Sequence, residues 1–213
     1  MFLNYLKIAL RSLLRHRTFS FINLFGLSIG LAASMLLLTF IHHELSYEKM
    51  HENRERIYRT IAKVNVSEDK TMIVSAAPGE VPVWLRNELP GVQHVVRIDP
   101  LRVRAVAYKN REIRDFTGHI VDSAFVEMFS LEATRGNLQK ALNGPGKMVI
   151  TEGFARRLFG GANPLGKTVI AGEEEYAISA VLKELPPNTF LDFDCLVSVA
   201  SLRNEQQYFE NRG

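Results

Sequence analysis

The stretch Gly161–Thr168, GANPLGKT, contains the residue types that most directly suggest chemistry in this sequence. It satisfies the pattern G-x-x-x-x-G-K-[ST], in which a glycine-rich backbone and a lysine surround the phosphates of a nucleotide. Such a site needs a strand before the loop and a helix after it, so that backbone N–H groups and the helix dipole converge on the phosphates. The segments on either side of the motif therefore decide whether it can bind ATP.

The flanking segments predict the opposite order. Before the motif, TEGFARRLFG predicts a short amphipathic helix that begins after the N-cap Thr151 and ends at Gly160. After the motif, TVIAGEEEYAISAVL predicts two strands joined by a polar turn. Pro164 also removes one of the N–H groups that a phosphate cradle would use. We therefore interpret GANPLGKT as a helix-to-strand turn and expect no ATP binding or hydrolysis there.

The rest of the sequence predicts no other reactive site. Cys195 is the only cysteine, which rules out a disulfide within the chain. There is no helical histidine pair, nucleophile elbow or Cys/His array, and the aspartates are scattered at expected turns and strand ends. We therefore expect no catalytic, cofactor-binding or metal-binding residue.

A long apolar segment precedes these elements. No Asp, Glu, Lys or Arg occurs from Thr18 to His43, and Phe19–Ile41 would form a helix of roughly 35 Å, long enough to cross a bilayer. A cleaved signal peptide, the alternative, would have a shorter apolar region and a small-x-small cleavage site, which LLLTFIHHELS does not offer. The sequence thus predicts an uncleaved transmembrane helix over residues 18–43.

The basic residues before this segment predict its orientation. They are Lys7, Arg11, Arg15 and Arg17, and without them 22 basic residues face 23 acidic ones. A basic flank on one side of a span favours the cytoplasm, so we expect residues 1–17 inside and residues 44–213 outside. The nearly neutral remainder has no basic patch for nucleic acid.

Two features of the membrane region have alternative interpretations. Residues 1–17 predict an amphipathic helix at the membrane surface, which serves as a topology signal and, in a second interpretation, also contacts a cytoplasmic partner. Gly26, Gly30 and Ser34 recur every four residues and predict a face for close packing against another transmembrane helix. Ordinary membrane-helix composition is the alternative explanation of this spacing.

The portion after residue 43 predicts an α+β domain with a mixed or mostly antiparallel sheet. We expect the membrane helix to continue through ELSYEKMHENRERIYR, and a helix to start near Pro78. Strands are expected at RIYRTIAKVNV, VQHVVRI, RVRAVAY and MVIT, with a hairpin turn at KNR, and GHIVDSAFVEMFSLEATRG predicts strand, short helix and strand.

These segments taken together resemble a known family. The opening NYLKIALRSLLRHRTFSFINLFGLSIGLAASMLLL, the post-span SYEKMHENRERIYR and the runs VDSAFVEMFSLEATRGNLQKAL, MVITEGFARRLFGGANPLGKTV and YAISAVLKELPPNTFLDFD are similar to the MacB/FtsX-like ABC transporter permease family. The resemblance implies a first transmembrane helix followed by a MacB-like periplasmic core domain, over residues 44–213, with a porter-like part. It also implies that GANPLGKT is a structural turn of that domain.

The resemblance further implies a function. Such permeases transmit movement from a cytoplasmic ABC ATPase subunit to a periplasmic domain, and ATP hydrolysis occurs in that separate subunit, so the chain itself is expected to be no enzyme. The expected location is the bacterial inner membrane, with other permease helices and a homo- or heterodimeric assembly as partners. We expect the chain to be C-terminally incomplete, truncated before the remaining membrane helices of the family. The alternative is a stand-alone membrane-anchored binding or adaptor module, or a non-functional truncation.

Overall fold

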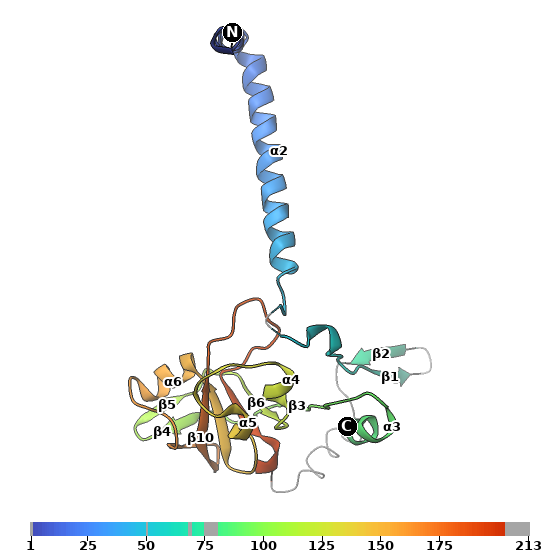
Figure 1. The fold of residues 1–213 in the computed structure, drawn as a ribbon, viewed down its shortest axis with the longest axis vertical. Coiled ribbons are helices and arrows are strands. Elements are labelled where there is room, and N and C mark those ends of the chain that lie inside the picture. Colours follow the sequence, from blue (N-terminus) through green and yellow to red (C-terminus); the bar gives the residue numbers. More distant parts are fainter. Residues whose placement is uncertain (1, 50, 68–69, 75–80, 203–213) are drawn as a thin grey trace. The chain divides into compact units, whose positions relative to one another are not determined.

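The chain divides into two compact units, residues 1–47 and residues 48–213 (Figure 1). The computed structural model describes residues 2–49, 51–67, 70–74 and 81–202.

The first unit consists of two helices. Helix α1 spans Phe2–Arg15 and helix α2 spans Arg17–Glu44, with a break at His16, whose φ of −111° and ψ of 57° are not helical. The hydroxyls of Ser28, Ser34 and Thr39 in α2 donate to carbonyls four residues earlier at 2.7–2.8 Å. These polar groups are therefore satisfied inside the helix, as an apolar environment requires.

Helix α2 ends at Glu44, so the predicted continuation through residue 59 is wrong. The chain turns over residues 45–49, and Glu48 has a φ of 57°, a left-handed conformation that a right-handed helix cannot contain. The Glu48 N–H donates to the Asn188 carbonyl at 3.1 Å instead of to a carbonyl four residues earlier. A contact with a distant part of the chain thus replaces the helical bond. A short 3-10 helix, η1 (Arg54–Arg56), follows.

A hairpin and a helix come next in the second unit. Strands β1 (Ala62–Ser67) and β2 (Lys70–Val74) pair antiparallel and form a two-stranded sheet of their own. Helix α3 covers Val81–Glu88, and its expected start near Pro78 lies outside the described residues. Because β1 begins at Ala62, the predicted strand in RIYRTIAKVNV occupies only the second half of that segment.

The main sheet of the second unit has nine strands. They are β3 (Ile98–Pro100), β4 (Val106–Tyr108), β5 (Arg111–Ile113), β6 (Gly118–Val121), β7 (Ala133–Gly136), β8 (Lys147–Thr151), β9 (Thr168–Ala171), β10 (Glu174–Leu182) and β11 (Cys195–Ser198). The order is β3-β6-β11-β8-β10-β9-β4-β5, and β7 also pairs with β10. Pairs β10–β8 and β11–β6 are parallel and the others antiparallel. This mixed sheet confirms the predicted α+β fold.

Most predicted strands of this sheet are present, but VQHVVRI is not the strand that its β-branched content predicts. Only its last residue, Ile98, lies in β3. The backbone N–H of Arg97 donates to Asp122 Oδ2 at 2.7 Å, and the Arg97 side chain makes further bonds to the same carboxylate. The carboxylate takes the backbone donor that a neighbouring strand would otherwise use.

Helices cover both faces of the main sheet. Along β8, Met148 and Ile150 point to a core cluster with α6 (Glu152–Phe159), whereas Val149 points to a second cluster. That second cluster contains residues of α4 (Phe125–Met128) and α5 (Leu138–Ala141). The 3-10 helix η2 (Val199–Ser201) follows β11. The alternation along β8 is the period of two that a strand buried on both faces requires.

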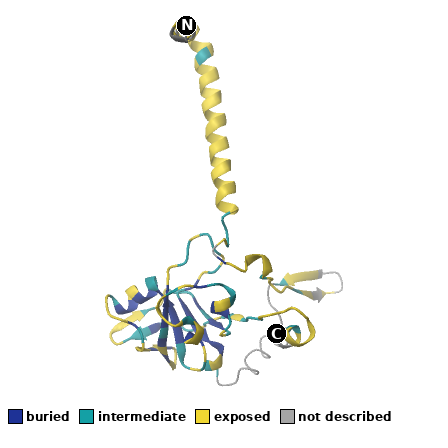
Figure 2. Cartoon of the chain, in the orientation of Figure 1, coloured by how far each residue is buried: buried dark blue, intermediate teal, exposed yellow. Residues whose placement is uncertain are grey.

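Buried residues concentrate in this sheet, whereas α2 has none (Figure 2). All three central residues of β8, Met148, Val149 and Ile150, are 0% exposed. The apolar side chains of α2 are exposed along its whole length, so this helix favours an apolar surrounding.

Candidate functional site

The GANPLGKT motif lies between helix α6 and strand β9, the order that the sequence predicts. Thr151 caps α6, because its side chain accepts a hydrogen bond from the Phe154 N–H at 3.2 Å. Gly160 ends the helix with a φ of 65°, which favours glycine. Strand β9 begins at Thr168, directly after Lys167, so the loop lacks the helix N-terminus on which a phosphate site depends.

Three consecutive backbone donors of this turn, at Leu165, Gly166 and Lys167, are already bonded within the protein. The Gly166 N–H donates to the Ile178 carbonyl at 2.8 Å, and the Lys167 N–H donates to the Pro164 carbonyl at 3.0 Å. Asn163 Oδ1 accepts from the Leu165 N–H at 3.3 Å. A phosphate would have to displace these contacts.

The same turn has a clear structural role. The Lys167 carbonyl accepts from the Ile178 N–H at 2.9 Å, which joins the loop to β10. Leu165 packs against the core cluster below α6. The motif therefore forms the turn that connects α6 to β9. The side chain of Lys167 is exposed.

The titratable groups inside the core are unsuited to nucleophilic chemistry. Burial, with a smaller contribution from nearby Asp194, raises the pKa of the Cys195 thiol to about 12. Burial also raises the pKa of Tyr176. A thiol that stays protonated at neutral pH is a poor nucleophile. Among the residues that the structure describes, no group of three or more His, Cys, Asp and Glu side chains could hold a metal ion.

Gly26, Gly30 and Ser34, the residues predicted to pack against another helix, lie one turn apart along α2. A Cβ atom added at Gly26 or at Gly30 would meet nothing within 4 Å, so this face is open. The Ser34 hydroxyl donates to the Gly30 carbonyl at 2.8 Å. By length and composition α2 can cross a membrane.

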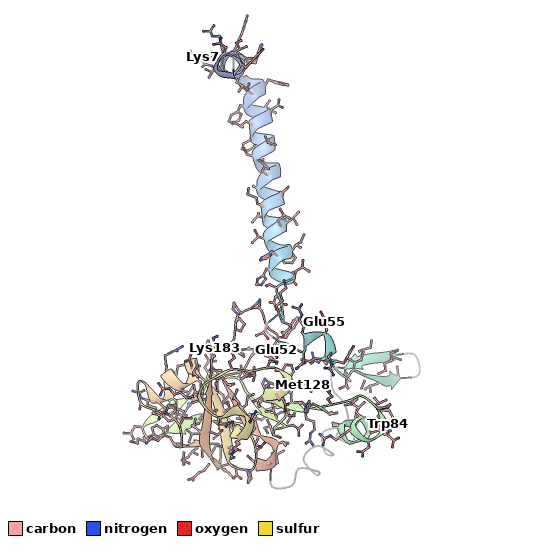
Figure 3. All side chains as sticks on the ribbon, in the orientation of Figure 1. Lys7, Glu52, Glu55, Trp84, Met128 and Lys183 are labelled. Atoms are coloured by element: carbon pink, nitrogen blue, oxygen red, sulfur yellow. The ribbon has the colours of Figure 1, made fainter. Side chains whose placement is uncertain are left out.

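The four predicted membrane-surface cations lie on α1 and at the start of α2. Lys7, labelled in Figure 3, and Arg11, Arg15 and Arg17 are all exposed. Lys7, Arg11 and Arg15 recur every four residues, which places them on one side of α1. Arg17 Nε donates to the Leu14 carbonyl at 3.2 Å, across the break between the helices.

Sequence reasoning missed one cluster, in which Glu48 and His51 contact the end of α4 and the loop before β11. His51 is only 3% exposed although it lies in a charge-rich stretch. Composition favours a solvated segment there, and only the contacts across the chain show the burial. No local signal could have identified this cluster.

Three comparisons place this architecture among known proteins. The family model of the MacB-like periplasmic core domain matches residues 20–212. No curated protein sequence matches the chain. A domain assigned to a permease protein from Porphyromonas gingivalis superposes with a TM-score of 0.58 at 21% sequence identity, covering 71% of this chain and 63% of that one.

Two further solved structures are similar. The periplasmic region of MacB from Actinobacillus actinomycetemcomitans gives a TM-score of 0.47 at 14% identity, covering 57% of this chain and 55% of that one. The extracellular domain of the noncanonic ABC-type transporter YknZ from Gram-positive bacteria gives a TM-score of 0.47 at 25% identity. The superposition covers 57% of this chain and 62% of that one. The chain thus spans less than two thirds of each solved domain.

The sheet, its flanking helices and the family match agree with one another. Because the family model covers residues 20–212, which include most of α2 and the whole main sheet, the chain belongs to the family of the MacB-like periplasmic core domain, a domain of ABC-type permeases.

Proposed function

We propose that this chain is a permease component that transmits ATP-driven movement from a cytoplasmic ABC ATPase subunit to an extracytoplasmic domain. In this proposal α2 spans the bacterial inner membrane, α1 lies on its cytoplasmic surface, and residues 48–202 form the moving domain. The observation that carries the proposal is the direct continuity of an apolar, fully exposed helix with a domain of this family.

Two further observations support a mechanical rather than a catalytic role. The N–H groups of Leu165, Gly166 and Lys167 in the GANPLGKT turn are bonded internally, which supports the proposal that ATP hydrolysis occurs in a separate subunit. The cations of α1 and Arg17 precede α2, which favours a cytoplasmic N-terminus. Their charge also suits anionic headgroups or an acidic cytoplasmic partner.

The experiment is co-purification of the tagged chain from membranes with an ABC ATPase, followed by hydrogen exchange of the complex with ATP and with ADP. We expect the exchange of amides in residues 48–202 to differ between the two nucleotides. A complex that hydrolyses ATP without any such difference contradicts transmission of movement. Failure to recover an ATPase from membranes contradicts the partner assignment.

A second candidate function is a stand-alone membrane-anchored binding or adaptor module. It is favoured by apolar side chains that remain exposed outside the main sheet, among them Met72 of β2 at 46% and Trp84 of α3 at 56%. Trp84 is labelled in Figure 3. Such a module would keep its stability and its location in membranes that contain no ABC ATPase. The co-purification above therefore separates the two candidates.

We further propose that Gly26, Gly30 and Ser34 pack against another transmembrane helix, from a second copy or from another permease chain. Small residues let backbones approach, and dispersion contacts then hold the helices together in lipid. Gly30→Leu should reduce crosslinking between helices in membranes, because the added side chain separates them. Ala32→Leu, on the opposite side of α2, is the matched control. Equal crosslinking in both variants would mean that the glycine spacing has no packing role.

A further inference from the structure

The segment that follows α2 is bonded to a distant loop through the carboxylate and the backbone N–H of one residue, Glu48. Glu48 Oε1 accepts from the Thr189 hydroxyl at 2.9 Å and from the Phe190 N–H. The Glu48 N–H donates to the Asn188 carbonyl at 3.1 Å. Three bonds thus join one residue, four positions after the end of α2, to three consecutive residues of the loop between β10 and β11.

The other carboxylate oxygen of Glu48 faces a buried histidine. Its Oε2 lies 2.7 Å from His51 Nε2. His51 Nδ1 lies 2.6 Å from the Phe129 carbonyl oxygen, which can only accept. Acceptor oxygens from two separate segments therefore lie next to both ring nitrogens of this buried histidine.

An aromatic series continues from this pair into the core. The His51 and Phe129 rings pack edge to face with their centroids 5.4 Å apart, and the centroids of the Phe129 and Phe125 rings are 4.7 Å apart. Phe125 is buried, and its ring packs edge to face against the Phe193 ring with the centroids 6.0 Å apart. Phe193 lies two residues before β11, which pairs with both β6 and β8 in the main sheet.

We propose that Glu48 and His51 are positioning residues that couple the exit of α2 to the sheet of the extracytoplasmic domain. Glu48 holds the loop 188–190 through hydrogen bonds, and His51 holds the end of α4 through its ring. A displacement of the chain after α2 then reaches β11 by two routes, the loop backbone and the aromatic series. The inference deepens the proposed function, because it names the residues through which movement would enter the domain.

The backbone conformation of Glu48 indicates that its contacts with the loop 188–190 are imposed by the fold and not by the backbone preference of the residue itself. Its φ of 57° disfavours a side chain with a Cβ, yet the position carries a long acidic residue. The bonds to Asn188, Thr189, Phe190 and His51 offset this strain. Glycine would adopt the backbone more readily but would lose every side-chain contact.

The test is hydrogen exchange by mass spectrometry on the full chain in lipid nanodiscs, without any ATPase. Glu48→Gly removes the carboxylate and relieves the backbone, and Glu48→Gln removes only the charge. We expect amides of residues 45–52 and 188–191 to exchange on the order of tenfold faster in both variants, because charge-assisted bonds are lost. Amides of β8 and β10 should keep their protection.

A control in the same segment makes the result specific. Glu52→Gln changes the same charge at an exposed position, labelled in Figure 3, and should leave exchange unchanged. Exchange like that of the wild type in both Glu48 variants would overturn the proposal. Equal acceleration throughout β8, β10 and β11 would overturn it too, because Glu48 would then stabilise the domain as a whole.

A second arm concerns His51 and keeps the test readable if Glu48 variants fold poorly. In this arm, His51→Ala removes the ring that contacts Phe129, and amides of residues 127–131 at the end of α4 should exchange faster than in the wild type. Exchange like that of the wild type over residues 127–131 would overturn the coupling through His51. Neither arm contains an ATPase, so failure of the mechanotransmission proposal and failure of this coupling are distinguishable.

Discussion

Helix α2 and strand β8 are both rich in apolar residues, but they place these residues in opposite surroundings. Met148, Val149 and Ile150 of β8 are 0% exposed, because helices cover both faces of the sheet. Leu36 of α2 is 73% exposed, and no residue of α2 is buried. Apolar residues favour a nonaqueous environment in either case. Packing within the protein provides it for β8, and in the proposed function lipid provides it for α2.

This difference also separates what each element contributes. The sheet obtains its stability from packing within the chain, and it can therefore serve as a rigid body. In the proposed function, helix α2 is held by its own backbone hydrogen bonds and by surrounding lipid, and it can therefore shift or tilt. The proposed transmission of movement uses one element of each kind.

The largest expected effect is the loss of a packed aromatic ring from the sheet unit. Phe154→Ala removes a side chain that is 0% exposed between α6 and the sheet and should lower the free energy of unfolding by about 3–5 kcal/mol. Pulse proteolysis of the full chain in urea measures this loss. Phe25→Ala makes the same deletion in α2, where the ring is 58% exposed, and should leave unfolding of the sheet unchanged. Equal losses in the two variants would break the comparison.

The second prediction concerns lipid as the solvent of α2. Leu31→Arg, near the middle of α2, should disfavour membrane insertion by about 2.5–3.5 kcal/mol, because a charged group is brought into hydrocarbon. The fraction of chain that resists carbonate extraction measures insertion. Leu14→Arg in α1 adds the same charge outside the span and should insert normally. Normal insertion of the Leu31 variant would mean that α2 does not lie in the bilayer core.

A smaller effect is expected at the start of α6. Thr151→Ala should cost about 1 kcal/mol, because it removes the hydroxyl that accepts from the Phe154 N–H at 3.2 Å. Thr151→Ser keeps the hydroxyl and should recover most of the loss. Urea unfolding of both variants decides the point, and equal stability of Ala and Ser at this position would show that the cap contributes nothing.

The smallest effect is expected at Lys167. Lys167→Ala should change stability by less than about 0.5 kcal/mol, because the side chain is exposed and the turn is held by its backbone. Titration with a fluorescent ATP analogue should give the same result for the wild type and the variant. A nucleotide affinity that disappears in the variant would mean that GANPLGKT is a binding site after all.

Sequence reasoning predicted the elements whose signals are local. Thr151 as a cap, Gly160 as a helix end and the two strands after Lys167 each depend on residues within a few positions. The same holds for the break between α6 and β9 on which the rejection of a phosphate site rests. Periodicity and caps suffice where neighbouring residues decide the conformation.

The errors arise where distant residues decide the conformation. Asp122 takes the backbone donor of Arg97, 25 positions earlier, and removes most of a strand that β-branched residues predict. Thr189 bonds Glu48 across 141 positions and helps hold the turn that ends α2. Neither contact has a sequence signal, so the cluster around Glu48 and His51 is recognisable only in the folded chain.

The central claim is that α2 crosses the membrane and leaves the sheet outside the cytoplasm, and cysteine labelling in intact cells tests it most directly. The wild-type chain should stay unlabelled by a membrane-impermeant maleimide, because its only cysteine, Cys195, is buried. Glu173→Cys, in the exposed turn between β9 and β10, should label in intact cells, and Ser12→Cys in α1 should label only after permeabilisation. Labelling of Ser12→Cys in intact cells with protection of Glu173→Cys would contradict the account.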